Sequence, residues 1–237
     1  MSLLKKVLPE NIYDKCIAYY HTFSISVVQK SFSQEGEDLI LSRFFENKKK
    51  GFYIDVGAYH PKRFSNTYKL YKMGWAGINI DARPGSMNIF DKLRPRDINI
   101  EAPVSDSNSK LTFYILNEPA VSGFLNKTRL EYLLNHNYKL EKKVFLNSIK
   151  LEDILIKHLP SNVNTIDFLT IDVEGFDFKV LKSNNWNKYR PTLVLIEDLE
   201  YSNQFKGNSE LTLYMKEKGY EIFAKTMNTV FFKNIKA

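Results

Sequence analysis

The sequence predicts an α/β fold: a mostly parallel sheet with helices on both faces, finished by an antiparallel hairpin. Three observations predict it. From residue 32 onward, short apolar runs alternate with stretches whose apolar positions recur at helical spacing. These runs lack a strict inside–outside alternation, which is typical of parallel strands buried on both faces. The chain ends in two strand-like segments joined by a turn, the pattern of a hairpin.

The first strand and helix units occupy residues 37–81. Residues 37–45 carry apolar positions at helical spacing, and residues 51–57 form a short apolar strand that ends in glycine. A helix is predicted over residues 65–73, because Ser65 is a favoured N-cap residue and a glycine at position 74 stops the helix. Residues 77–81 form the second apolar strand.

The alternation continues to residue 218. Three further strands are bounded by turn residues: 97–102, 165–172 and 192–197. Helical patterns lie around them at 86–93, 176–183 and 209–218. The tail differs, because residues 220–224 and 229–232 flank a turn at residues 226–228. A parallel sheet with this ending is a Rossmann-like arrangement, and seven strands are expected in total.

Two parts of the chain fall outside this pattern. Residues 1–31 are expected to be an N-terminal helical extension, in which residues 13–28 form an amphipathic helix that packs on protein or, as the alternative, lies on a membrane surface. Residues 105–150 are less regular and are interpreted as an insertion near the site. Extra strands are expected at residues 110–116 and 143–150, and one helix is expected at residues 127–136.

Composition restricts the class of protein. Apolar residues make up 43% of the chain and charged residues 26%, which is ordinary for a globular protein and excludes a disordered one. A single cysteine, Cys16, excludes a disulfide framework or a cysteine-based zinc site within one chain. No apolar stretch of about 18 residues is present to span a membrane. The absence of a signal-peptide pattern favours a cytoplasmic location.

The charge balance indicates which partners are compatible. Lys and Arg exceed Asp and Glu by 34 to 27, giving a net charge of +7. This permits an anionic partner such as a nucleotide, a phosphosugar, nucleic acid or an acidic lipid surface. An ordinary solvated surface is an equal alternative. The sequence leaves a homo-oligomer and a peripheral membrane contact open.

Acidic residues follow nearly every predicted strand. In open α/β sheets, ligands bind outside the carboxyl ends of the strands. The acids at these ends are Asp55, Asp81, Asp106, Asp172 and Glu197. One acid could simply cap the next helix, but their recurrence along the sheet edge favours a binding site.

The spacing of two residues indicates the cofactor class. Asp81 lies 24 residues after Gly57, which matches the acid that binds a ribose diol in nucleoside-binding α/β folds. Its two oxygens can accept both hydroxyl protons. The loop after the first strand has one glycine, and Tyr59 and Pro61 would obstruct a pyrophosphate, so NAD is disfavoured. A nucleoside ligand without phosphates remains compatible with this loop, and S-adenosylmethionine is the commonest ligand of that kind.

Five ordered blocks carry a family resemblance. They are SQEGEDLIL at 33–41, YIDVGAYHP at 53–61, SNT at 65–67, GWAGINIDARPG at 74–85 and IDVEGFD at 171–177. Together they resemble the FkbM family of S-adenosylmethionine-dependent methyltransferases, over about residues 32–200. The resemblance implies a class I methyltransferase domain at 32–237. It also implies O-methylation of a sugar, sugar nucleotide or related glycan or natural-product intermediate.

Carried over by position, the blocks imply a cofactor site. The residues expected there are Gln34, Asp55, Gly57, Ala58, Tyr59, Asp81, Ala82, Arg83, Ser105 and Asp106. Asp81 would hold the ribose, with Ala82 and Arg83 beside the adenine. Ser105 and Asp106 would flank the adenine edge, and the residues after the first strand would line the methionine and ribose end.

Methyl transfer to a hydroxyl requires that the donor sulfur, the methyl carbon and the acceptor oxygen are aligned. It also requires that the hydroxyl proton is removed. Asp172 and Glu174 are expected where the acceptor meets the methyl group, and His60 is a further candidate base. As alternatives, His60 could bind backbone at a helix entry and Glu174 could hold the cofactor's ammonium. Four aromatic residues could stack on a sugar, although core packing is favoured: Tyr114, Phe124, Tyr132 and Tyr138.

Three further hypotheses stay open. Asp172, Glu197 and Asp198 could hold Mg²⁺, as strand-end carboxylates do in catechol-type O-methyltransferases, or the last two could cap the following loop. The positive charge suggests a nucleic-acid methyltransferase, although nucleic acid is a disfavoured partner. Base methylation is disfavoured because no base-methyltransferase motif follows the fourth strand, and an RNA ribose methyltransferase stays open although the lysines that it needs cannot be located in the sequence. A catalytically inactive partner subunit of the same fold is the last alternative.

Overall fold

The computed structural model describes residues 2–23, 29–173, 175–198 and 209–235. It divides into two compact units, Met1–Ser31 and Phe32–Ala237, each treated by itself below. The first unit holds helices α1 (Ser2–Val7) and α2 (Glu10–Phe23). Helix α2 begins three residues before the stretch predicted to be helical, and residues 24–28 of that stretch lie outside the described part of the chain. Within its own unit, α2 has no buried residue.

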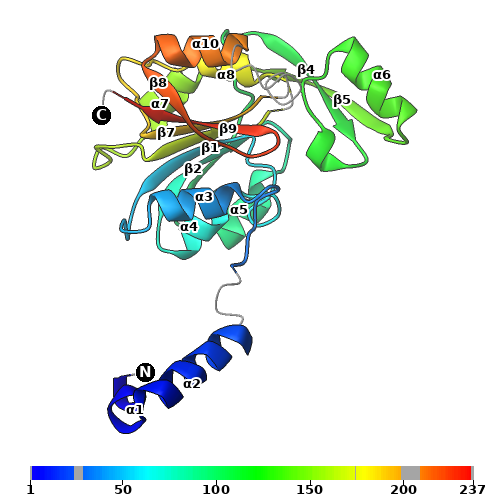
Figure 1. Cartoon of the computed structure of the whole chain (residues 1–237). Coiled ribbons are helices and arrows are strands. Elements are labelled where there is room, and N and C mark those ends of the chain that lie inside the picture. The colour runs from blue at the N-terminus through cyan, green and yellow to red at the C-terminus, as the bar shows by residue number, and fades with distance from the viewer. Residues whose placement is uncertain (1, 24–28, 174, 199–208, 236–237) are drawn as a thin grey trace. The chain divides into compact units, whose positions relative to one another are not determined.

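The second unit is built on a seven-stranded sheet with the order β3-β2-β1-β6-β7-β9-β8 (Figure 1). Five strands are parallel: β1 (Phe52–Val56), β2 (Ala76–Asp81), β3 (Ile98–Glu101), β6 (Phe168–Ile171) and β7 (Leu193–Glu197). The hairpin of β8 (Tyr220–Lys225) and β9 (Thr229–Asn234) adds antiparallel to β7. The predicted Rossmann-like sheet with its antiparallel ending is therefore confirmed.

Helices cover both faces of this sheet (Figure 1). One face carries α3 (Glu37–Phe44), α4 (Tyr68–Lys72) and α5 (Met87–Leu93). The other carries α7 (Leu151–His158), α8 (Asp177–Lys182) and α10 (Glu210–Glu217). Successive strand residues point to opposite faces, so Tyr53 packs with Leu41 and Leu70 while Ile54 belongs to the core under α7, α8 and α10.

Helix α4 is shorter than predicted. It begins at Tyr68, although Ser65 was expected to cap a helix over residues 65–73. The side chains of Asn66 and Thr67 are bonded to Thr170 and Asp55 of the sheet, and the Ser65 hydroxyl accepts the N–H of Tyr68 at 3.1 Å, where the helix begins. Helix α7 is a second difference, because the sequence analysis assigns no element to residues 151–158.

The insertion forms a separate two-stranded sheet. Strands β4 (Lys110–Leu116) and β5 (Leu140–Asn147) pair antiparallel, with the short 3-10 helix η1 (Pro119–Val121) and helix α6 (Lys127–Asn135) between them. The second strand lies earlier than the predicted 143–150, because Ser148 and Ile149 instead bond to residues 103–109. In the part of the chain that the structure describes, no helix is long and apolar enough to cross a bilayer.

Candidate active site

A pocket of about 140 Å³ opens at the carboxyl ends of β1, β2 and β6. Eight residues expected from the sequence line it: Gln34, Gly57, Tyr59, Asp81, Ala82, Arg83, Asp172 and Glu197. They come from five separate segments of the chain, and the parallel strands bring their ends to one edge of the sheet. The pocket therefore unites most of the predicted nucleoside-binding residues with two of the predicted acids at the acceptor end.

Gly57 lies at the bottom of the pocket, where the ends of β1 and β6 meet. Its φ of +86° is the left-handed conformation that glycine adopts without strain. A Cβ at this position would lie 1.7 Å from the carbonyl oxygen of Asp172. Its N–H donates to the carbonyl of Ile80 at 2.9 Å. No other residue type fits here, and the close approach brings the ends of two strands together under the pocket.

Asp81 holds the two loops that border the pocket. One carboxylate oxygen accepts the backbone N–H of Tyr59 at 2.9 Å, and the other accepts that of Arg83 at 2.8 Å. Burial raises the pKa of Asp81 above its usual value of 3.8, while these two N–H groups favour the charged form. A carboxylate has about four lone-pair directions. Each oxygen can therefore accept one further hydrogen bond, as a ribose diol requires.

The loop after β1 forms one wall. Tyr59 and Phe64 both line the pocket, and their rings stack with centroids 6.2 Å apart. The guanidinium of Arg63 lies 4.5 Å from the Phe64 ring centroid and donates to the Tyr59 hydroxyl at 3.0 Å. Arg63 also lies 3.8 Å from Glu118 of the insertion. The loop and the insertion thus meet at the rim.

Residues of the insertion and of the segment after β3 form the opposite wall. The sequence predicts that the insertion lies near the site but does not identify the residues of it that line the pocket besides Phe124, which are Phe113, Pro119, Ala120, Ser122 and Gly123. Ala102 and Val104, just after β3, line it as well. Of the four aromatic candidates, Phe124 lines the pocket and packs edge-on against Phe113 at 5.1 Å. Tyr114 and Tyr138 pack against the small core beneath α6, and Tyr132 is half exposed.

Several expected cofactor residues lie outside this pocket. Asp55 is buried on the α4 side of the sheet, where it accepts the hydroxyl of Thr67 at 2.7 Å. Burial raises the pKa of Asp55 to about 6. Ala58 packs in the core with Met87 and Phe90. Ser105 is buried and bonds to Asp106, which pairs with Lys182 at 3.5 Å.

His60 binds backbone groups at the entry to the next segment, which was the alternative to its role as a base. Its Nδ1 accepts the backbone N–H groups of Lys62 and Arg63, at 3.1 and 3.0 Å, and it is not among the pocket-lining residues. Burial lowers the pKa of His60, as do the neighbouring charges of Arg63 and Lys62. The imidazole is therefore neutral, and it stabilises the loop by accepting these two hydrogen bonds.

Acidic residues also border the pocket and the space next to it. Asp172 and Glu197 line both the pocket and a smaller hollow beside it, which Glu35 and Glu37 also border. Glu35 accepts the backbone and side-chain N–H groups of Asn228, and Glu37 accepts the hydroxyl of Thr229. The SQEGED block therefore joins the tip of the β8–β9 hairpin and carries Gln34 to the pocket. Glu174, the other expected acid, lies outside the described residues.

The hypothesis of a magnesium site is not supported. Residues 2–23, 29–173, 175–198 and 209–235 include no group of three or more His, Cys, Asp or Glu that could hold a metal ion. Asp198 accepts the hydroxyl of Ser209 at 2.5 Å and borders a different hollow, near Gly175 and Leu211. Asp198 does not line the pocket that Asp172 and Glu197 share, so the three carboxylates do not meet at one point there.

Comparison with known proteins gives the family. The model of the methyltransferase FkbM domain matches residues 55–222. No curated protein matches the chain.

Two solved structures share a low similarity. One is assigned as an RNA methyltransferase from Pyrococcus horikoshii. It is 10% identical to this chain with a TM-score of 0.43, and the alignment covers 84% of this chain and 83% of the other. Another, assigned as an O-methyltransferase from Klebsiella pneumoniae, is 10% identical with a TM-score of 0.40, covering 98% and 94%. The assignment rests on the family match: the chain belongs to the FkbM family of S-adenosylmethionine-dependent methyltransferases.

Proposed function

We propose that this methyltransferase transfers the methyl group of S-adenosylmethionine to a hydroxyl of a sugar, sugar nucleotide or related glycan or natural-product intermediate. The observation that carries the proposal is one pocket that both Asp81 and Asp172 line. The donor supplies an activated methyl group on a positively charged sulfur. The chain has to bind it, orient the acceptor and take up the hydroxyl proton.

The residues present fit this cofactor. Asp81 offers two further acceptor directions toward a ribose diol. Apolar side chains of Ala102, Val104 and Phe113 form the wall beyond it, suited to a flat adenine. Arg83 and Ala82 border the same region, so the adenosine would lie between the end of β2 and the insertion.

Asp172 is the proposed base. It lies on the pocket at the end of β6, beside Gly57, where the acceptor hydroxyl would approach the methyl group. A positioned carboxylate that accepts the proton typically contributes about 10²–10⁴-fold to the rate. Glu197 borders the same space and is proposed to orient the acceptor through its hydroxyl groups.

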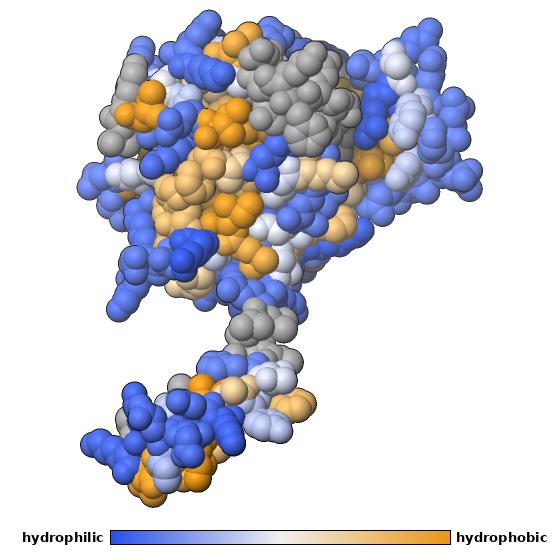
Figure 2. All heavy atoms as spheres, viewed as in Figure 1, coloured by the Kyte–Doolittle hydropathy of each residue, from blue (hydrophilic) through white to orange (hydrophobic). Residues whose placement is uncertain are grey.

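The charge of the insertion favours an anionic portion of the acceptor. Residues 105–150 carry seven Lys and Arg against four Asp and Glu, a net +3 of the chain's +7. Figure 2 shows largely hydrophilic surface in the region that Figure 1 labels α6 and β5. Because this basic segment borders the pocket through Phe113 and residues 119–124, a nucleotide-linked or phosphorylated sugar could place its phosphates there and its hydroxyl at Asp172.

The test is a transfer assay with methyl-labelled S-adenosylmethionine. The acceptor panel contains neutral sugars, phosphosugars, sugar nucleotides, cell-lysate glycans and RNA. The expected result is label on an oxygen of a sugar hydroxyl, located by mass spectrometry and NMR. Label confined to RNA ribose would replace this function by the nucleic-acid alternative. Cofactor binding without transfer to any acceptor class would favour the inactive-subunit alternative.

A further inference from the structure

The loop between β1 and α4 needs to be held in place. Tyr59 and Phe64, which form a pocket wall, have φ angles of +51° and +55°. Such left-handed conformations are unfavourable for bulky side chains and persist where surrounding contacts enforce them. Asp81 fastens the start of this loop through the N–H of Tyr59. The loop therefore requires an equally firm attachment at its other end.

Three consecutive residues supply that attachment. The backbone N–H of Ser65 donates to the carbonyl of Phe32 at 3.0 Å. The side-chain amide of Asn66 donates to the hydroxyl of Thr170 on β6 at 3.0 Å. The hydroxyl of Thr67, which is fully buried, donates to Asp55 on β1 at 2.7 Å. Each residue of the SNT block thus connects the loop to a different segment.

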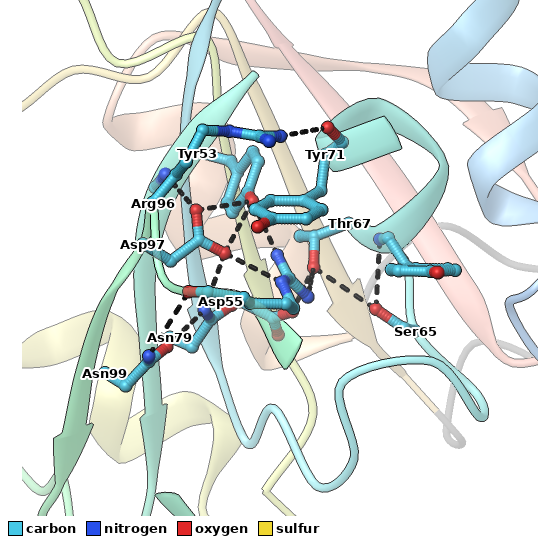
Figure 3. A network of polar contacts seen from close by, with 12 residues as sticks. Tyr53, Asp55, Ser65, Thr67, Tyr71, Asn79, Arg96, Asp97 and Asn99 are labelled. Carbon is cyan, nitrogen blue, oxygen red and sulfur yellow. Dashed lines mark hydrogen bonds and ion pairs between the residues drawn. The ribbon is translucent and has the colours of Figure 1, made fainter. Parts of the chain in front are cut away.

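Thr67 lies in a network of polar contacts with Asp55, Tyr53 and Asp97 (Figure 3), and it is also bonded to the buried charge of Arg94. The guanidinium of Arg94, which has no exposed surface, donates to the Thr67 hydroxyl at 2.9 Å. Arg94 donates as well to Asp97 at 2.7 Å and to the hydroxyl of Tyr53 at 2.5 Å. Rings of Tyr53, Tyr71 and Phe90 surround it, with centroids 5.0–5.7 Å away.

Asp97 anchors this cluster to the sheet. Its carboxylate accepts the Tyr53 hydroxyl, the backbone N–H of Gly77 at 2.9 Å and the side-chain amide of Asn79 at 3.0 Å. Gly77 and Asn79 belong to β2, and Tyr53 belongs to β1. The Arg94 guanidinium is therefore held by groups bonded to two strands, and its Nη1 donates to Thr67.

We propose that Thr67 and Arg94 are positioning residues of the cofactor pocket: Arg94 orients the Thr67 hydroxyl toward Asp55, and this bridge holds Tyr59 and Phe64 in their pocket-lining conformation. The hydroxyl is suited to this, because it accepts from the guanidinium and donates to the carboxylate at the same time. The inference rests on the proposed function in one respect, namely that the cofactor occupies this pocket.

The experiment compares three variants. Thr67→Val removes the bridging hydroxyl and keeps the shape of the side chain, whereas Thr67→Ser retains the hydroxyl. Thr212→Val is the matched control, because Thr212 on α10 is equally buried and its hydroxyl contacts that of Ser209 at 3.0 Å, away from the loop. Urea unfolding measures the stability of each variant. Hydrogen exchange of the free protein and calorimetric titration with S-adenosylmethionine then measure loop order and affinity.

The proposal predicts a selective effect. In Thr67→Val, the amides of residues 57–65 exchange at least 10-fold faster than in the parent, and the dissociation constant for S-adenosylmethionine rises at least 10-fold. Thr67→Ser restores both, and Thr212→Val changes neither beyond a factor of two. Equal exchange of the loop amides in Thr67→Val and the parent would overturn the proposal, as would an equal effect of Thr212→Val. If the parent protein binds no S-adenosylmethionine, the proposed function fails, and the exchange data alone decide the positioning role.

Discussion

Asp55 provides a quantitative test of the buried charge network. Its carboxylate lies beneath the pocket with 6% of the residue exposed, bonded to Thr67. Burial raises its pKa from 3.8 to about 6; Arg94 and the Thr67 hydroxyl counteract the burial, and Asp97 and Asp81 add to it. Replacement by asparagine removes the charge while keeping an oxygen that can accept the Thr67 hydroxyl.

The sign of the effect follows from the two states. Because the folded pKa of Asp55 lies above its unfolded value, the folded protein holds a proton between pH 4 and pH 6 that the unfolded chain has released. The contribution of Asp55 therefore becomes less favourable as pH rises through this window and is constant above it. A shift of about two pKa units corresponds to about 3 kcal/mol, at about 1.4 kcal/mol per unit.

Asp55→Asn is accordingly expected to be more stable than the parent by about 3 kcal/mol at pH 8, and about equally stable at pH 4. Urea unfolding at several pH values between 4 and 8 measures the difference. Asp97→Asn is the matched control: it places an amide where Arg94, Tyr53 and Gly77 all donate, and is expected to destabilise by about 3–5 kcal/mol. A stability difference between Asp55→Asn and the parent that is independent of pH, or an Asp55→Asn variant less stable at pH 8, would refute the reasoning.

Three further predictions concern the pocket itself. Asp81→Ala should raise the dissociation constant for S-adenosylmethionine at least 10-fold in calorimetry, because hydrogen bonds to a charged group are worth about 1.5–3 kcal/mol each; an unchanged value rejects the ribose assignment, and Asp106→Ala, outside the pocket, is the control. Asp172→Asn should lower kcat by about 10²–10⁴-fold while leaving cofactor affinity within a few fold; unchanged turnover rejects Asp172 as the base. Gly57→Ala should prevent stable folding, measured by circular dichroism melting, because its Cβ would meet the Asp172 carbonyl at 1.7 Å; a melting temperature equal to that of the parent would contradict this contact.

The sequence predicts what depends on local pattern. The strands are short apolar runs, and Gly57 and Asp81 stand at their ends at a spacing set by one strand and one helix. Both residues are found on the pocket for that reason. The same pattern does not tell which way a strand-end side chain points. Asp55 shares the face of Tyr53, so it joins the buried network under α4 and not the pocket.

The features that the sequence does not predict depend on contacts between residues far apart in the chain. Arg94 looks like a surface residue in the sequence, yet it is completely buried because Asp97, Tyr53 and Thr67 satisfy its donors together. Phe64 enters the pocket only because its loop adopts a left-handed turn there. Ser65 has the residue type of a helix cap, but its neighbours are attached to β1 and β6, and the helix starts three residues later.

The most direct measurement is a crystal structure of the protein with S-adenosylhomocysteine. We expect adenosine in the pocket between β2 and the insertion, both ribose hydroxyls within hydrogen-bond distance of the Asp81 carboxylate, and the sulfur facing Asp172. A ligand bound elsewhere, or a ribose turned away from Asp81 in this pocket, would contradict it.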